Sequence, residues 1–291
     1  MKFFIIALSL LISGQNQALA HEICRDALVQ QKIFGRFMKP FDLEHFKEGS
    51  HPTVIGFVQD QASFSLDNNV NIQDMVIKMP NTDVRVPNEY ERFSEAVHKI
   101  FTFEQQHNPN YKDYYAYITV KQRTVGANQA QRRPGVHGDG FPESLDEEQV
   151  PIAHTYVVTD NNPTVFDSQS FDFSDVQHEG EILALMEAQK DEGKSVQGHP
   201  YNITYMDPYT VHRSPEFKEG QSFRRTFFRI IFSLQKHNRM GNGYNPLFEY
   251  DWMMYPRGSS RAPLYTLKGI DGSGNMAVPA RVGTPEAAQR R

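Results

Sequence analysis

The sequence lacks three features that would assign it to a class at once. Cys24 is the only cysteine among 291 residues, so no disulfide can form within the chain, and a disulfide-stabilised secreted scaffold is excluded. The formal net charge of -5 argues against a general phosphate-binding surface, and we expect no nucleic-acid partner. After residue 20 no apolar run approaches the roughly 18 residues of a membrane span, so no stable membrane insertion is expected of the mature chain.

The first twenty residues predict a secretory signal peptide rather than part of the fold. A short basic start, Met1-Lys2, precedes an apolar run over 3–12 and the small-residue cleavage site Ala18-Leu19-Ala20. Cleavage after Ala20 predicts a secreted or periplasmic protein. It would also expose His21 as an N-terminal histidine, which raises the alternative of a copper site of the histidine-brace kind; such enzymes usually also rely on disulfides.

The remainder predicts one domain over 21–256 and a flexible tail over 257–291 that is rich in glycine, serine, proline and alanine. Hydrophobic residues make up 39% of the chain, enough to bury a core. Apolar periodicity indicates a mainly β fold with flanking helices. Strands are expected over 53–58, 70–79 with a bulge, 111–120, 150–158, 165–166, 201–205, 211–212 and 223–233, helices over 23–37, 93–101 and 178–190, and loops over 121–134, 141–149 and 191–198.

A candidate metal site begins in the segment Val136–Phe141. If this segment is extended, the imidazole of His137 and the carboxylate of Asp139 lie on the same face, because side chains alternate along a strand. His212, after a short apolar run, is the candidate third ligand, and His154 is its substitute, although a packed core histidine is the safer interpretation there. Two histidines and one carboxylate with open positions suit non-haem ferrous iron.

Two arginines lie inside the most strongly β-prone segment, 223–233. Arg225 and Arg229 share one face of this expected strand with Phe227. A buried guanidinium is costly unless it meets an anion, and its planar fork matches a carboxylate. The segment therefore predicts an anion site beside the metal ligands.

Taken together, His137-Gly138-Asp139, His212 and Arg225 resemble the HxD…H…R pattern of the Fe(II)- and 2-oxoglutarate-dependent dioxygenases, over roughly residues 110–235. The resemblance implies a double-stranded β-helix core of the jelly-roll or cupin kind. It also implies Fe(2+) held by His137, Asp139 and His212, with 2-oxoglutarate and O2 as cosubstrates. An arginine would bind the far carboxylate of 2-oxoglutarate; Arg225 fits the pattern, and Arg229 either replaces it or binds a substrate carboxylate.

These features leave several functions open. A role for Arg229 toward substrate favours hydroxylation of an aliphatic C–H bond in a small carboxylate-bearing molecule such as an amino acid. The signal peptide favours a protein side-chain hydroxylase with a peptide substrate. A zinc hydrolase could use the same two histidines and aspartate but has no need of an arginine inside a strand. A non-catalytic β-barrel binding protein is the remaining alternative.

Overall fold

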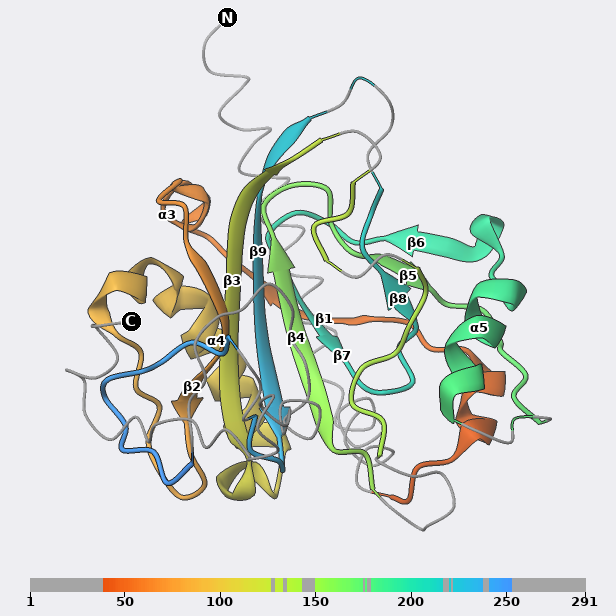
Figure 1. The fold of residues 1–291 in the computed structure, drawn as a ribbon, viewed down its shortest axis with the longest axis horizontal. Helices are drawn as coiled ribbons and strands as arrows, with labels where there is room; N and C mark the ends of the chain where they lie inside the picture. Colours follow the sequence, from red (N-terminus) through yellow and green to blue (C-terminus); the bar gives the residue numbers. More distant parts are fainter. Residues whose placement is uncertain are drawn as a thin grey trace, which may run out of the picture.

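The computed structural model describes residues 39–252 except 127–128, 133–134, 143–149, 175, 177–178, 217–219, 221 and 238–240 (Figure 1). The expected signal peptide, Cys24, the helix over 23–37, most of the acidic loop and the tail lie outside the described residues. Within the described ranges, no helix has the length and apolar character needed to cross a membrane.

The described chain folds into two antiparallel sheets. The larger one has the order β1-β7-β4-β9-β3-β2, and the smaller one has the order β6-β5-β8. The strands of the larger sheet are β1 (Thr53–Phe57), β2 (Asn71–Lys78), β3 (Tyr115–Val125), β4 (Ala153–Thr159), β7 (Asn202–Met206) and β9 (Phe223–Ser233). Those of the smaller sheet are β5 (Val165–Asp167), β6 (Ser195–Gln197) and β8 (His212–Arg213). From β4 onward the chain passes back and forth between the sheets, which confirms the predicted mainly β, double-stranded β-helix architecture.

The central strand β9 separates the main core from the space between the sheets. Phe228, Ile230 and Phe232 belong to the core cluster that packs under helix α4 (Ser94–His107). The alternate residue Phe227 belongs to a second cluster, with Val157, Phe166 and Met206. Because side chains alternate along a strand, the two arginines predicted to share a face with Phe227 point away from α4. Each fully buried large apolar side chain stabilises the fold by about 1.5–3 kcal/mol.

The remaining elements flank the sheets (Figure 1). They are η1 (Leu43–Glu48), α3 (Gln61–Ser65), η2 (Asn88–Phe93), η3 (Tyr111–Asp113), α5 (Glu179–Gln189) and η4 (Glu192–Lys194). Phe46 of η1 and Ile182 of α5 pack with Tyr209 in a hydrophobic cluster that also contains Val136. Helix α5 also accepts a hydrogen bond from the Val136 amide at Glu187 Oε2, 2.9 Å away. These contacts fix the segment that leads into His137.

Three segments differ from the sequence-based expectation. Strand β3 continues to Val125, inside the expected loop over 121–134, because it pairs with β9 along its whole length, from Tyr115 opposite Ser233 to Val125 opposite Phe223. The expected loop over 191–198 contains η4 and β6. Residues 111–113 form a short 3-10 turn instead of the start of a strand. Pairing across the sheet overrides the polar local composition in the first two segments.

Candidate metal centre

The two predicted histidine ligands form one rung of antiparallel β-structure. The amide of His137 donates to the carbonyl of His212, and the reverse bond has the same length, 2.9 Å. Residues paired in this way direct their side chains to the same face. The two imidazole centroids are accordingly 4.5 Å apart, with 54° between the ring planes.

Backbone carbonyls fix the tautomer of both rings. Nδ1 of His137 lies 2.9 Å from the carbonyl oxygen of Gly135, and Nδ1 of His212 lies 2.9 Å from that of Thr210. A carbonyl oxygen can only accept, so each Nδ1 carries the proton and donates it. In this tautomer each Nε2 carries the lone pair, and histidine metal ligands typically bind through one ring nitrogen while the other donates its N–H.

Asp139 completes the group. The ligand atoms of His137, Asp139 and His212 all lie within 4.8 Å of one another. Oδ2 of Asp139 is 3.8 Å from Nε2 of His212. Two atoms that each bind one ion at about 2.1 Å are at most about 4.2 Å apart, so this pair already spans a single ion. The three predicted ligands are brought together, and their donor set fits a divalent metal.

Two glycines allow the backbone to bring Asp139 back toward the histidines. A Cβ on Gly138 would lie 2.7 Å from the ring of Phe141 and 2.8 Å from the Pro208 carbonyl oxygen. Gly140 has φ +89°, and a Cβ there would lie 2.2 Å from the carbonyl oxygen of Ala153. The segment is thus a bend after His137 rather than the continuous strand that the sequence suggested.

Nearby cations keep the Asp139 carboxyl ionised. Burial by itself raises its pKa, but in the acidic range where this carboxyl titrates the imidazoles are protonated, and the charges of His212, Arg229, His137 and Arg132 outweigh burial and lower the pKa to about 2. The side chain keeps 36% exposure. At neutral pH Asp139 is a carboxylate, the form that binds metal.

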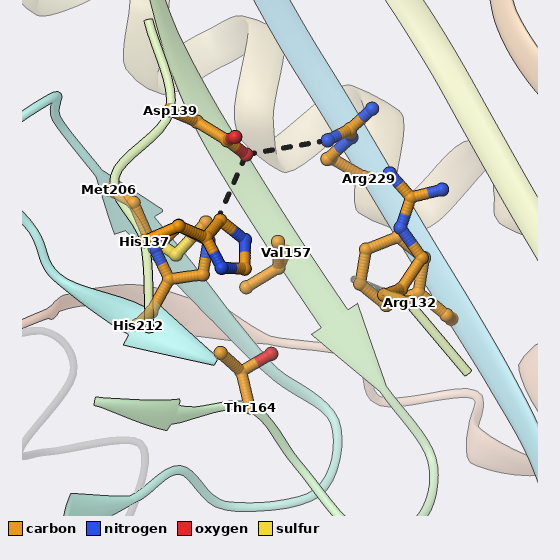
Figure 2. A pocket seen from close by; sticks show the side chains of 9 residues that line it. Arg132, His137, Asp139, Val157, Thr164, Met206, His212 and Arg229 are labelled. Carbon is orange, nitrogen blue, oxygen red and sulfur yellow. Dashed lines mark hydrogen bonds and ion pairs between the residues drawn. The ribbon is translucent and has the colours of Figure 1, made fainter. Parts of the chain in front are cut away.

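A cavity of about 120 Å³ opens beside this group. Figure 2 shows the two imidazoles on one side of it and the guanidinium groups of Arg132 and Arg229 on the other, with Asp139 and Thr164 at opposite ends. Its lining consists of Arg132, His137, Asp139, Val157, Thr164, Met206, His212, Phe227 and Arg229. Three of these side chains, Val157, Met206 and Phe227, are apolar.

Arg229 is held between two carboxylates. Its Nη2 donates to Asp74 Oδ1 at 3.1 Å, and its Nη1 is 3.5 Å from Asp139 Oδ2. Asp74 is only 4% exposed, also accepts a hydrogen bond from the Thr119 hydroxyl at 2.7 Å, and has φ +43°. It lies at the irregularity of β2 between Ile72 and Met75, which confirms the predicted bulge.

Arg225 does not line the cavity, although the sequence favoured it as the carboxylate-binding arginine. Its side chain is 1% exposed, and its Nε donates to the carbonyls of Asn161 at 2.9 Å and Asn162 at 3.0 Å. Its Nη1 donates to Gln131 Oε1 at 2.5 Å. Burial lowers the pKa of Arg225 to about 10. The donors of this arginine therefore hold the protein's own chain, and Arg229 is the strand arginine on the cavity wall.

His154, the substitute ligand, is a core residue. Its Nε2 lies 2.5 Å from Glu104 Oε1 of helix α4, with both side chains fully buried. Glu104 also accepts a hydrogen bond from the Tyr156 hydroxyl at 2.5 Å, and the burial of that hydroxyl, followed by the charge of Glu104, raises its pKa. The His154 ring stacks on Phe232 with 7° between planes. This position lies on the α4 side of the sheet, away from the metal group.

Sequence reasoning missed three residues of the site: Arg132, Asp74 and Thr164. The only local signal for Asp74 was an acidic residue inside an otherwise apolar strand, which must find a buried partner. Arg132 lies in a polar segment with no periodicity, five positions before His137. Thr164 is an ordinary turn residue in the sequence.

No protein-family model matches the chain, and no curated protein sequence matches it. Among solved structures, it is similar to EvdO2 from Micromonospora carbonacea var. aurantiaca, complexed with 2-oxoglutarate, at 11% identity over 66% of this chain and 89% of that chain, with a TM-score of 0.38. AviO1 from Streptomyces viridochromogenes Tue57 is 13% identical over 66% and 92%, with a TM-score of 0.37.

The chain is also similar to the solved structure of SnoN, a non-heme alpha ketoglutarate dependent epimerase from nogalamycin biosynthesis, in complex with Fe3+, alpha ketoglutarate and nogalamycin RO. It is 13% identical over 89% of this chain and 96% of that chain, with a TM-score of 0.38. At these identities and TM-scores the similarities do not indicate the activity of this chain.

Proposed function

We propose that the protein is a non-haem Fe(II)- and 2-oxoglutarate-dependent dioxygenase that hydroxylates an aliphatic C–H bond of a small carboxylate-bearing substrate such as an amino acid. One observation carries the proposal. His137 and His212 present their unprotonated Nε2 atoms beside the Asp139 carboxylate, in an arrangement that backbone hydrogen bonds have already fixed.

The donor set and its surroundings favour iron over zinc. Two imidazoles and one carboxylate on one side of an ion, with the remaining positions open, suit ferrous iron in oxygenases. Among the described residues, no fourth histidine, cysteine or carboxylate joins the group to close it as a structural zinc site. Many hydrolytic zinc sites use a carboxylate or histidine as general base, and the described residues that line the cavity include no glutamate and no further histidine.

Bound ferrous iron would supply the oxidation, in which one oxygen atom of O2 enters succinate as 2-oxoglutarate loses CO2 and the other becomes the product hydroxyl. The protein supplies position, charge and exclusion of water. His137, Asp139 and His212 would hold the ion. Arg229 places a positive charge beside Asp139 that would favour an anionic cosubstrate, and Val157 and Met206 form an apolar wall.

The size and charge of the cavity support binding of a small anionic molecule. Its volume of about 120 Å³ is below the range of about 300–1,000 Å³ that is typical of pockets for drug-sized ligands. Two arginines in so small a lining suit carboxylates, because the guanidinium fork binds them with two parallel hydrogen bonds.

The test is anaerobic addition of Fe(II) and then 2-oxoglutarate to the full-length protein. We expect a weak metal-to-ligand charge-transfer absorption band, which His212→Ala abolishes. His98→Ala, which removes an exposed histidine of α4, is the matched control and should keep the band. A protein that retains zinc and shows no band would be the hydrolase, and one that binds no metal would be a non-catalytic binding protein.

A further inference from the structure

We infer that Asp74, a residue of strand β2, is a positioning residue for the metal: its carboxylate neutralises Arg229, so that a cation can bind at Asp139. The inference rests on the metal site of the proposed function and deepens it. It concerns the ion alone and requires no cosubstrate.

The position of Arg229 beside Asp139 by itself opposes a bound cation. Nη1 of Arg229 is 3.5 Å from Asp139 Oδ2, and the same oxygen is 3.8 Å from Nε2 of His212 (Figure 2). An ion held by the three predicted ligands would therefore lie close to a guanidinium that is only 7% exposed. Like charges repel more strongly in a buried site than in water. The arginine also competes with the ion for the carboxylate.

Asp74 supplies the compensating charge on the other side of the guanidinium. Its Oδ1 accepts hydrogen bonds from Arg229 Nη2 at 3.1 Å and from the Thr119 hydroxyl at 2.7 Å. The Thr119 oxygen in turn accepts from the Asp74 amide at 2.9 Å, so its single proton is directed at the carboxylate. The charge of Arg229 is thus shared between two carboxylates, and Asp74 draws it away from the metal-binding atoms.

The backbone around Asp74 is arranged to make this contact. Thr119 and Arg229 lie opposite each other in β3 and β9, so their side chains share one face of the sheet. Asp74 has φ +43°, and the carbonyl of the preceding Gln73 accepts from the Gly243 amide at 2.7 Å. A bulge redirects a side chain, and aspartate tolerates the left-handed backbone better than most residues. Backbone strain at a buried charge beside the candidate site points to function rather than packing.

The experiment measures Fe(II) affinity by anaerobic calorimetric titration of the metal-free full chain, without 2-oxoglutarate. Asp74→Asn keeps the shape and a hydrogen-bond acceptor but removes the charge, and it should weaken Fe(II) binding by about tenfold or more. The double variant Asp74→Asn/Arg229→Gln removes both charges and should bind within about threefold of the wild type. A role of Asp74 in shaping the bulge alone would show no such rescue. Asp67→Asn, which removes the partner of Arg224 on the opposite face of β9, is the control and should change nothing.

The outcomes separate the inference from the function on which it rests. Unchanged affinity in Asp74→Asn, or a loss that the double variant does not restore, would overturn the role of Asp74. If thermal melting shows that Asp74→Asn does not fold, Arg229→Gln replaces it: this variant removes the cation and should bind Fe(II) at least as tightly as the wild type, and weaker binding by the folded variant would overturn the inference.

The wild-type protein gives the remaining comparison. A wild type that binds no Fe(II) would overturn both the role of Asp74 and the proposed function. One that binds Fe(II) but gives no charge-transfer band with 2-oxoglutarate would overturn the dioxygenase proposal alone, because the Fe(II) affinities of the variants are measured without the cosubstrate.

Discussion

Gly140 makes the bend that returns Asp139 to the histidines, and no larger residue can replace it. Its φ of +89° and the 2.2 Å approach of a Cβ to the Ala153 carbonyl oxygen both oppose a side chain. Gly140→Ala should destabilise the protein by about 2 kcal/mol or more and weaken Fe(II) binding. Thermal melting and a Fe(II) titration measure the two effects. Gly56→Ala in β1, where the nearest atom is 4.0 Å away, is the control; an equal effect of both variants would contradict this account.

The interaction of His154 with Glu104 gives a second prediction for a single residue. His154→Phe removes a hydrogen-bond partner of a buried carboxyl group and should destabilise the protein by about 2 kcal/mol. It should leave Fe(II) affinity unchanged, because this ring packs under α4. Denaturant unfolding and metal titration check the two parts. Loss of Fe(II) binding by a folded variant would return His154 to the list of ligands.

At the scale of residues, the sequence predicts those site residues whose type and spacing are themselves characteristic of a metal or anion site. The grouping of His137, Asp139 and His212 could be predicted because few residue types bind a metal ion, and a partner for Arg229 because a charge inside a β-prone segment needs one. Arg132 and Asp74 could not be found, since their contacts with the cavity depend on a loop path and a β-bulge. The hydrogen bonds of Arg225 could not be predicted either, because its Nε donates to the backbone carbonyls of residues 161 and 162, which any residue type could supply.

At the scale of elements, Glu95 joins helix α4 to the connection between β1 and α3. It accepts hydrogen bonds from the amides of Gln59 and Asp60 and from Lys99 Nζ. Partial burial by itself raises the pKa of Glu95, but these donors outweigh it and hold the pKa below its ordinary value of 4.5. The unfolded chain therefore takes up the proton first as the pH falls.

This difference sets the pH range in which Glu95 stabilises the fold. Its contribution is fully present above about pH 4.5 and is lost as the pH falls through the lower pKa of the folded state. Glu95→Gln should cost about 1 kcal/mol at pH 7 and clearly less at pH 3. Urea unfolding of both proteins at the two pH values measures this. The exposed Glu91→Gln should show no such difference, and a cost for Glu95→Gln that is as large at pH 3 as at pH 7 would rule out the ionic explanation.

Strands whose own residues favour β-structure could be predicted from the sequence, whereas strands that form only by pairing with a neighbour could not. The strand 223–233 was predicted with its observed bounds, because its apolar and β-branched residues leave one interpretation. The end of β3 and the short β6 were missed, since their residues are polar and become strands only by pairing with β9 and β5. Hydrogen bonds between strands require a partner, which a single segment does not reveal.

At the scale of the whole molecule, backbone pairing between two sheet segments holds the predicted ligands His137 and His212, so we expect the fold to form without the ion. Removing the metal with a chelator should leave the far-ultraviolet circular dichroism spectrum unchanged. Adding Fe(II) at about 100 times its dissociation constant should then stabilise the fold by about 2.7 kcal/mol, by linkage alone. Thermal melting under anaerobic conditions measures the gain. His212→Ala should melt at the same temperature with and without the ion, and a spectrum that collapses on chelation would contradict the prediction.

Export is the other whole-molecule prediction. The pattern of residues 1–20 predicts that the chain is cleaved after Ala20, so the mature protein should begin at His21. Mass spectrometry of protein recovered from the extracytoplasmic fraction measures its N-terminus. A protein that retains Met1 in every fraction would refute the signal.

The rung between His137 and His212 couples correct alignment of the sheet to the presence of a working centre. A slip by one position at this rung would turn an imidazole outward, because neighbouring residues of a strand face opposite sides. Chains with a shifted register would therefore not bind the ion. Ion binding would then measure the fraction of chains that have folded with the correct strand register.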